Sequence, residues 1–232
     1  MGNSGNSQSG NLGIGGLVGR KLASGVRRLG MFVVSQRFGA SPSQIYDEEF
    51  YDGYVSPQQE STAPAVAEIL IELFRPASVF DVGCGNGIYS RELAARSVQA
   101  FACDGSSHAI RRVPPSVFCF QHDLKEPLAT NRKFDLCICF EVAEHIPKRF
   151  SQNLVASCAA IGDTVVFSSA PPGQGGQDHI NEQPDAYWDE LFGHHALLPD
   201  SATTARLRER FRSRDVIHWL TSNTRVYRRG NG

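Results

Sequence analysis

Three alternating glycines follow a short apolar segment in the string Asp81-Val82-Gly83-Cys84-Gly85-Asn86-Gly87. An apolar segment that runs into a glycine-rich turn and then a helical pattern is typical of strand, loop and helix. Because glycine lacks a Cβ, the backbone of such a turn can lie directly against a ligand. In open α/β sheets ligands bind beyond the carboxyl ends of the strands, where this turn is expected. The string therefore predicts a cofactor-binding loop.

The spacing of the glycines does not match the dinucleotide pattern G-x-G-x-x-G, whose last glycine would fall at Ile88 or Ser90. The string D-x-G-x-G-x-G, which begins at Asp81, instead resembles motif I of the class I S-adenosylmethionine-dependent methyltransferases. The resemblance implies a doubly wound, Rossmann-like α/β fold. Its mostly parallel sheet has helices on both faces and a C-terminal antiparallel strand. The implied cofactor is S-adenosyl-L-methionine, and the implied reaction is methyl transfer.

Acidic residues after later apolar segments match the same family. Asp104 can accept hydrogen bonds from both ribose hydroxyls, which is the role the resemblance implies. Asp123, followed by Leu124, matches the position that contacts the adenine amino group. For Asp81, holding the glycine loop through backbone N–H groups explains the residue equally well. The implied cofactor-binding residues are Asp81, Gly83, Cys84, Gly85, Asn86, Gly87, Asp104, Gly105, Asp123, Leu124 and Glu141.

The string Glu141-Val142-Ala143-Glu144-His145-Ile146-Pro147 resembles the segment that closes the cofactor site in many small-molecule methyltransferases. If the acceptor is a hydroxyl, a base assists the transfer, and His145 and His179 are the candidate catalytic residues. A structural role at the start of a helix is the alternative for His145.

The segment from Pro172 to Trp188 is similar to a group of bacterial methyltransferase-domain proteins. By that resemblance we expect the acceptor to be a hydroxyl of a small molecule or a glycan. Tyr187, Trp188, His179 and Asn181 are suited to contact such an acceptor, and equally suited to pack a lid.

Two other functions use the same residues. Glu141, Glu144, His145 and His179 resemble the divalent-metal set of the small-RNA 3′-terminal 2′-O-methyltransferases. The surrounding sequence does not resemble that RNA family, so the main expectation is a site without metal. The second alternative is a non-catalytic, cofactor-binding scaffold. The intact glycine turn and Asp104 argue against a loss of binding.

The elements that must position these residues alternate along the chain, as a parallel sheet covered on both faces requires. Strands are predicted over 78–82, 99–103, 117–121, 134–140 and 164–168. Helices are predicted over 62–75, 88–96, 107–112, 148–160, 185–192 and 206–214. Val216–Leu220 and Thr224–Arg228 are expected to be two closing strands.

Composition divides the chain into three segments. Residues 1–16 are rich in Gly, Asn and Ser and are predicted to be disordered. Residues 17–44 form a basic, potentially amphipathic segment, and residues 45–232 form the methyltransferase domain. The first 40 residues carry five basic and no acidic side chains, so weak contact with anionic lipid is one explanation of the basic segment. A packed or poorly ordered helix is the simpler one.

A net charge of −1 and 41% hydrophobic residues are typical of an ordinary soluble protein, and nucleic acid is not expected as a partner. The arginines at alternate positions from 206 to 214 point around a helix rather than to one face. No apolar run reaches membrane-spanning length and no secretion signal is recognisable, so a cytoplasmic location is expected. The six cysteines, mostly within apolar segments, are predicted to be reduced. The sequence does not indicate an oligomeric state.

Overall fold

The computed structural model describes Met1, residues 41–54 and residues 57–230. The chain divides into a unit of residues 1–40 and a unit of residues 41–232, and the second carries the fold. The expectations for residues 2–40, including the tail and most of the basic segment, lie outside the described residues.

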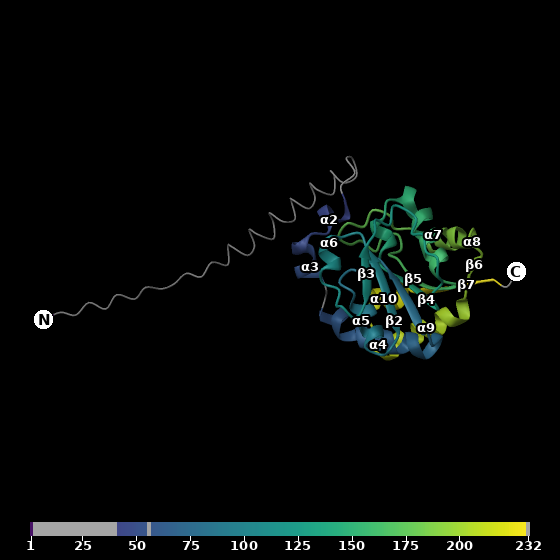
Figure 1. The fold of residues 1–232 in the computed structure, drawn as a ribbon, viewed down its shortest axis with the longest axis horizontal. Coiled ribbons are helices and arrows are strands. Elements are labelled where there is room, and N and C mark those ends of the chain that lie inside the picture. The colour runs from purple at the N-terminus through teal and green to yellow at the C-terminus, as the bar shows by residue number, and fades with distance from the viewer. Residues whose placement is uncertain (2–40, 55–56, 231–232) are drawn as a thin grey trace. The chain divides into compact units, whose positions relative to one another are not determined.

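A seven-stranded sheet forms the centre of the molecule, in the order β3-β2-β1-β4-β5-β7-β6 (Figure 1). The strands are β1 (Ser78–Val82), β2 (Gln99–Asp104), β3 (Phe118–Gln121), β4 (Leu136–Phe140), β5 (Thr164–Ser168), β6 (Leu197–Pro199) and β7 (Arg225–Arg229). Strands β1 to β5 pair in parallel, whereas β7 pairs antiparallel with both β5 and β6. The doubly wound sheet with an antiparallel C-terminal strand is therefore confirmed.

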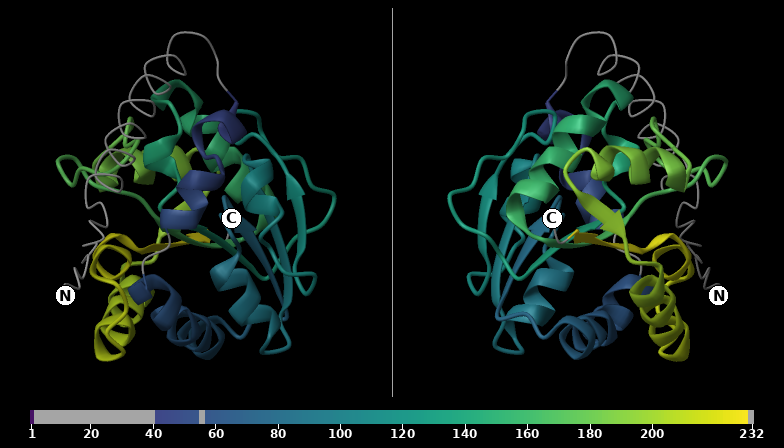
Figure 2. Two further views of the ribbon diagram at one scale, coloured as in Figure 1. Left: turned by 90° about the vertical axis from the view of Figure 1, so that its left-hand side faces the viewer. Right: turned by 90° about the vertical axis from the view of Figure 1, so that its right-hand side faces the viewer.

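Helices cover both faces of the sheet. The α-helices are α2 (Pro42–Ile45), α3 (Glu48–Tyr54), α4 (Pro57–Phe74), α5 (Ile88–Ala94), α6 (Ser107–Ile110), α7 (Ser151–Ile161), α8 (Asp185–Gly193), α9 (Ser201–Ser213) and α10 (His218–Asn223). Figure 2 shows the sheet between a layer with α4 and α9, in blue and yellow-green, and a green layer with α7 and α8. Within the described part of the chain, every helix is too short or too polar to cross a bilayer.

Alternate residues of each strand face opposite layers, because side chains in a strand repeat every two residues. Val79 and Ile138 pack with the α4 layer, whereas Phe80 and Cys139 pack with the α7 layer. All five residues of β1 and of β4 are buried, which explains why both segments are almost continuously apolar. All six cysteines are free and all but one are buried, in agreement with the prediction of reduced thiols.

One predicted closing strand is wrong. Val216–Leu220 was expected to be extended, but α10 begins at His218. Ile217 and Leu220 are both buried, and their spacing of three residues suits a helix rather than a strand. The other predicted closing strand, Thr224–Arg228, is confirmed as β7. Its partner β6 was not predicted, because its three residues end in a proline and are too few for a recognisable pattern.

The helix predicted over 62–75 begins earlier than expected. Helix α4 starts at Pro57, and Pro64 lies inside it. The hydroxyls of Ser61 and Thr62 donate to the carbonyl of Gln58 at 3.0 and 2.8 Å. Serine and threonine commonly form this bond to the preceding turn when they lie inside a helix.

Candidate functional site

The glycine loop connects the carboxyl end of β1 to α5. Gly83, Gly85 and Gly87 have φ angles of 75°, 56° and 74°, a region that residues with a Cβ rarely occupy. The N–H groups of Gly83 and Cys84 both donate to the carbonyl of Cys103 on β2, at 2.8 and 3.0 Å. The loop therefore lies across the ends of two neighbouring strands, as the sequence predicts for a ligand-binding turn.

Gly83 also brings the loop against the segment that follows β4. A Cβ added at Gly83 would lie 2.5 Å from Cγ2 and 2.9 Å from Cγ1 of Val142. Val142 belongs to the Glu141–His145 segment, so this close approach holds that segment against the glycine loop.

We expect Gly83→Ala to destabilise the protein by about 2 to 4 kcal/mol, through its positive φ and its overlap with Val142. Urea unfolding measures the change. In the double variant Gly83→Ala/Val142→Ala the overlap is gone, so its measured cost should fall below the sum of the two single variants. If the loss of stability in the double variant equals the sum of the two single losses, the overlap with Val142 does not contribute to the cost of Gly83→Ala.

Asp104 ends β2 and faces the glycine loop. Its Oδ2 accepts the N–H of Gly85 at 2.9 Å and its Oδ1 accepts the N–H of Ser106 at 2.8 Å. Burial raises the pKa of Asp104, and these backbone donors oppose the shift. A carboxylate has about four lone-pair directions, so both oxygens keep capacity for further donors such as hydroxyls.

Helices α2 and α3 pack onto this edge of the sheet. The Ser106 hydroxyl donates to the carbonyl of Tyr46 at 2.6 Å, and the Ser107 N–H donates to the Ser43 hydroxyl at 2.8 Å. The Tyr51 ring lies beside Gly85, since a Cβ added there would be 3.9 Å from Cε1 of Tyr51. No helix and no site residue was predicted over 42–54 from the sequence. Tyr46, Phe50 and Tyr51, spaced at four and one residues, are the signal that was available.

Asp81 contacts α5 rather than the glycine loop. Its Oδ2 accepts a hydrogen bond from the Ser90 hydroxyl in the first turn of that helix, and only 2% of the residue is exposed. Burial raises the pKa of Asp81 to about 7, although the Ser90 hydroxyl partly offsets this effect. Among the described residues, no backbone N–H of the loop bonds to Asp81, so the expected loop-holding contact is replaced by one to the helix.

The raised pKa of Asp81 predicts a specific pH dependence of stability. Between the usual carboxyl pKa of 3.8 and about 7, the folded protein keeps a proton that the unfolded chain releases. Raising the pH across this window should therefore lower the free energy of unfolding, by up to about 4 kcal/mol in total. Asp81→Asn should reduce this slope by the contribution of Asp81, as measured by urea unfolding at pH 4.5 and pH 8. Glu209→Gln, on the exposed side of α9, serves as the control that keeps it.

The other predicted cofactor residues differ in burial and in the contacts they make within the protein. Asp123 forms an ion pair with Lys125 at 3.0 Å, whereas the neighbouring Leu124 is buried. Gly105 lies against α2, because a Cβ added there would be 2.7 Å from Pro42. Asn86 is half-buried in the glycine loop. Cys84 is buried, and its Sγ lies 3.8 Å from that of Cys119. Because its side chain packs in this way, Cys84 would contribute only its backbone to a ligand on the loop.

The segment after β4 carries two buried carboxyl groups. Glu141 has a positive φ of 52°, and both its oxygens lie 3.3 Å from the Nδ2 of Asn223 on α10. Glu144 is completely buried, and neither of its oxygens has a hydrogen-bond partner among the described residues. Burial, and then the neighbouring Glu141, raise the pKa of Glu144 well above its usual range.

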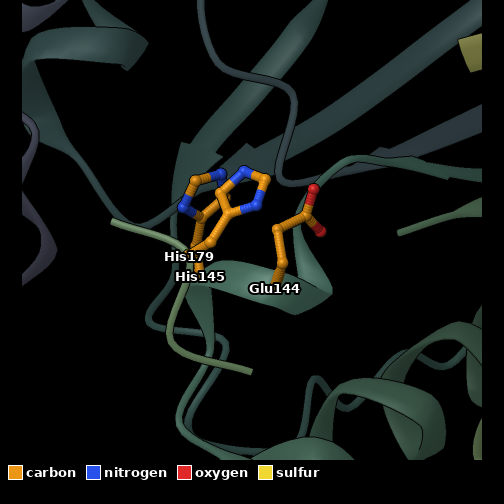
Figure 3. A group of neighbouring side chains, drawn as sticks. All are labelled: Glu144, His145 and His179. Atoms are coloured by element: carbon orange, nitrogen blue, oxygen red, sulfur yellow. The ribbon is translucent and has the colours of Figure 1, made fainter. Parts of the chain in front are cut away.

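Glu144, His145 and His179 converge on one point (Figure 3). One carboxyl oxygen and one nitrogen of each imidazole lie within 4.8 Å of one another, and the two rings meet edge to face at 5.1 Å. The Nδ1 of His145 lies 3.2 Å from the carbonyl of Asp178. Burial and the adjacent His179 lower the pKa of His145 to about 4. The structure thus brings together three of the four residues considered for a metal; the fourth, Glu141, lies beside Glu144 and bonds to Asn223.

The loop after β5 carries His179 to this point. The N–H groups of Ile180 and Asn181 donate to the carbonyl of Glu144 at 2.8 and 3.0 Å, which ties the loop to the segment after β4. Asn181 is buried and donates to the carbonyl of Ala143, and Trp188 is buried against Phe167. These two side chains pack the loop. Of the four acceptor candidates, Tyr187 and His179 remain partly exposed.

Solved structures with the same fold are methyltransferases. The magnesium protoporphyrin IX methyltransferase of Synechocystis PCC 6803, solved with bound SAH, aligns with a TM-score of 0.54 at 16% identity over 88% of this chain and 93% of its own. CalS10, an amino pentose methyltransferase from Micromonospora echinaspora, aligns with a TM-score of 0.57 at 15% identity over 79% of this chain and 96% of its own. At these identities the likeness concerns the fold alone.

Curated relatives carry the name ubiquinone biosynthesis O-methyltransferase. The protein of Psychrobacter cryohalolentis is 29% identical over 162 residues, which cover 66% of this chain and 57% of the relative. That of Nitrosomonas europaea is 30% identical over 132 residues, which cover 52% of this chain and 51% of the relative. The matched region thus spans little more than half of either relative. The family model described as methyltransferase domain matches residues 54–221, well over half of the chain. The chain therefore belongs to the methyltransferase-domain family.

Proposed function

We propose that this chain is an S-adenosylmethionine-dependent methyltransferase that acts on a hydroxyl of a small molecule. The observation that carries the proposal is the position of the glycine loop. Gly85 of this loop donates to the carboxylate of Asp104, and Gly83 lies against Val142, in the segment that also carries Glu144 and His145. His179 converges on the same two residues. The segment after β4 therefore connects the cofactor seat to the proposed base.

The residues around the loop suit an adenosyl amino acid. Asp104 would accept hydrogen bonds from the ribose hydroxyls, because each of its oxygens accepts one backbone N–H and has a lone-pair direction left. The bare backbone at Gly85 would lie against the amino acid part, with Tyr51 covering it. When bound, this cofactor supplies a methyl group on a positively charged sulfur.

His179 is the proposed base. The low pKa of His145, about 4, makes its imidazole a poor proton acceptor near neutral pH. The side chain of His179 is only 9% exposed, and its Nδ1 bonds to Glu182, which leaves Nε2 for a substrate proton. His179 would accept the hydroxyl proton at Nε2 while the acceptor oxygen gains the methyl group; the sulfur–methyl bond would break in the same displacement, which leaves S-adenosylhomocysteine. Within this buried cluster the protein can align the acceptor and exclude water.

The acceptor class rests on the names of the relatives. The curated relatives are named O-methyltransferases, which favours a hydroxyl over an amine or a carbon. A glycan hydroxyl remains within the proposal, since sugar and phenol hydroxyls both need a base and an aligned pocket.

Calorimetry with S-adenosylmethionine and an assay of S-adenosylhomocysteine release test the proposal. We expect binding in the first, and release in the second with at least one member of a panel of phenols and simple sugars. Binding without release under any acceptor would favour the alternative of a cofactor-binding scaffold. Absence of binding would refute the proposal.

A divalent-metal site is the second candidate, and the unpartnered Glu144 favours it. A buried carboxyl without a hydrogen bond, beside two imidazoles that each keep a free nitrogen, is a set of N and O donors suited to a divalent ion. Glu144, His145 and His179 would hold the ion, which would supply Lewis-acid polarisation of an acceptor oxygen. The same set would serve the RNA 2′-O-methyltransferase alternative.

Chelation separates the two candidates. Under the primary proposal, activity survives dialysis against EDTA, and titration with Mn²⁺ shows no binding. Under the second, activity is lost and returns with Mn²⁺, and Glu144→Gln weakens Mn²⁺ binding about ten- to hundredfold by calorimetry. Glu209→Gln is the matched control, because Glu209 is exposed on α9, away from the cluster.

A further inference from the structure

Glu182 connects the loop after β5 to the imidazole of His179. Its Oε2 accepts the N–H of Gly173 at 2.8 Å, and its Oε1 accepts the N–H of Gly175 at 2.7 Å. The Nδ1 of His179 lies 2.9 Å from the same Oε1. One side chain therefore closes the loop on itself and contacts the proposed base.

The geometry around Glu182 is that of an anion-binding backbone turn. Gly173 and Gly175 have φ angles of 86° and 68°, and their N–H groups point at the carboxylate. Backbone N–H groups arranged in this way form a concave site for an anion. His179 and these N–H groups lower the pKa of Glu182, so its side chain is a carboxylate.

A carboxylate has no hydrogen to donate, and this determines which ring nitrogen of His179 must carry a proton in their hydrogen bond. The hydrogen bond between Nδ1 and Oε1 can form only if Nδ1 carries the proton. Neutral His179 then has its lone pair on Nε2, and Nε2 has no partner among the described residues. The backbone of Gly176 also lies against the ring, because a Cβ added there would overlap Nε2 and Cε1.

We infer that Glu182 is a positioning residue that fixes the tautomer and orientation of His179. The inference rests on the proposed function, in which the Nε2 lone pair of His179 accepts the hydroxyl proton of the substrate. Glu182 acts through His179 and touches no substrate. A purely structural explanation is that Glu182 only ties the loop, and it predicts no effect on where the imidazole proton resides.

The tautomer can be observed directly by NMR of the full chain labelled with ¹⁵N-histidine. Long-range ¹H–¹⁵N spectra report which nitrogen is protonated, and His179→Gln identifies the signals of His179. In the unmodified protein we expect the Nδ1–H tautomer. In Glu182→Ala, which removes the acceptor, we expect the Nε2–H tautomer to appear, and Glu182→Gln should show a mixture. Glu209→Gln should leave the spectrum unchanged.

Turnover provides the second measurement. With an acceptor that supports turnover, we expect Glu182→Ala to lower kcat about ten- to hundredfold while the Kd for S-adenosylmethionine stays the same. Added to His179→Ala, it should cause no further loss, because both changes remove the same function.

The NMR spectra and the turnover measurement test different claims, so one can fail without the other. A protein that does not transfer methyl groups would refute the proposed function, and the spectra would still test the role of Glu182. An Nε2–H tautomer in the unmodified protein would overturn the inference. So would a tautomer that stays unchanged in both Glu182 variants, even if those variants melt at a lower temperature.

Discussion

Asp104→Ala should weaken the binding of S-adenosylmethionine by roughly ten- to hundredfold, measured as the Kd in calorimetry. The change removes charge-assisted hydrogen bonds to the ribose, which contribute about 1.5 to 3 kcal/mol. It also leaves the N–H groups of Gly85 and Ser106 without their acceptor, so the glycine loop loses one of its ties to β2 and keeps the bonds of Gly83 and Cys84 to Cys103. Both effects act in the same direction.

Asp123→Ala is the comparison for this prediction. Asp123 already pairs with Lys125 at 3.0 Å, so its removal should weaken binding less than the removal of Asp104. Thermal unfolding of both variants must show that the protein is folded at the temperature of the titration. An Asp104→Ala protein that binds as tightly as the unmodified one would place the ribose elsewhere.

His179→Ala should lower kcat for methyl transfer by about 10² to 10⁴, the usual contribution of a general base. The cofactor should bind with unchanged affinity, because the glycine loop and Asp104 are untouched. S-Adenosylhomocysteine release measures the rate, and calorimetry measures the affinity.

His194→Ala is the matched control, since His194 is exposed beyond the end of α8. It should turn over at the unmodified rate. Undiminished turnover in His179→Ala would assign the proton transfer to another group, whereas a parallel loss of cofactor binding would indicate that the loop had collapsed.

The sequence predicted the sheet because its strands are buried on both faces and alternate with helices. The five parallel strands were found within two residues of their observed ends, because their apolar runs are bounded by turns. Strand β6 was missed because three residues carry no pattern. Helix α10 was predicted to be a strand because its first residues belong to a short apolar run. Short apolar segments do not distinguish helix from strand, and tertiary packing decides between them.

The candidate site was predicted less completely than the fold. The glycines, Asp104 and the two histidines follow strand ends, so their convergence follows from the topology of the sheet. The contact of Asp81 with Ser90 and the contact of Glu182 with the glycines at 173 and 175 depend on loop geometry. No periodicity encodes such contacts. Tyr51 reaches the glycine loop only because α3 packs against α6, the helix that follows β2, a tertiary arrangement absent from the local sequence.

The position of α3 has a consequence for how quickly spent cofactor leaves. A molecule lying on the glycine loop has Tyr51 in its way, so departure requires this helix to lift. Two solvent-accessible ion pairs fasten it, Arg111 with Glu48 at 3.2 Å and Arg112 with Asp52 at 2.5 Å. Dissolved ions screen such pairs, so moderate salt should speed departure of the product while leaving the buried carboxylates unaffected.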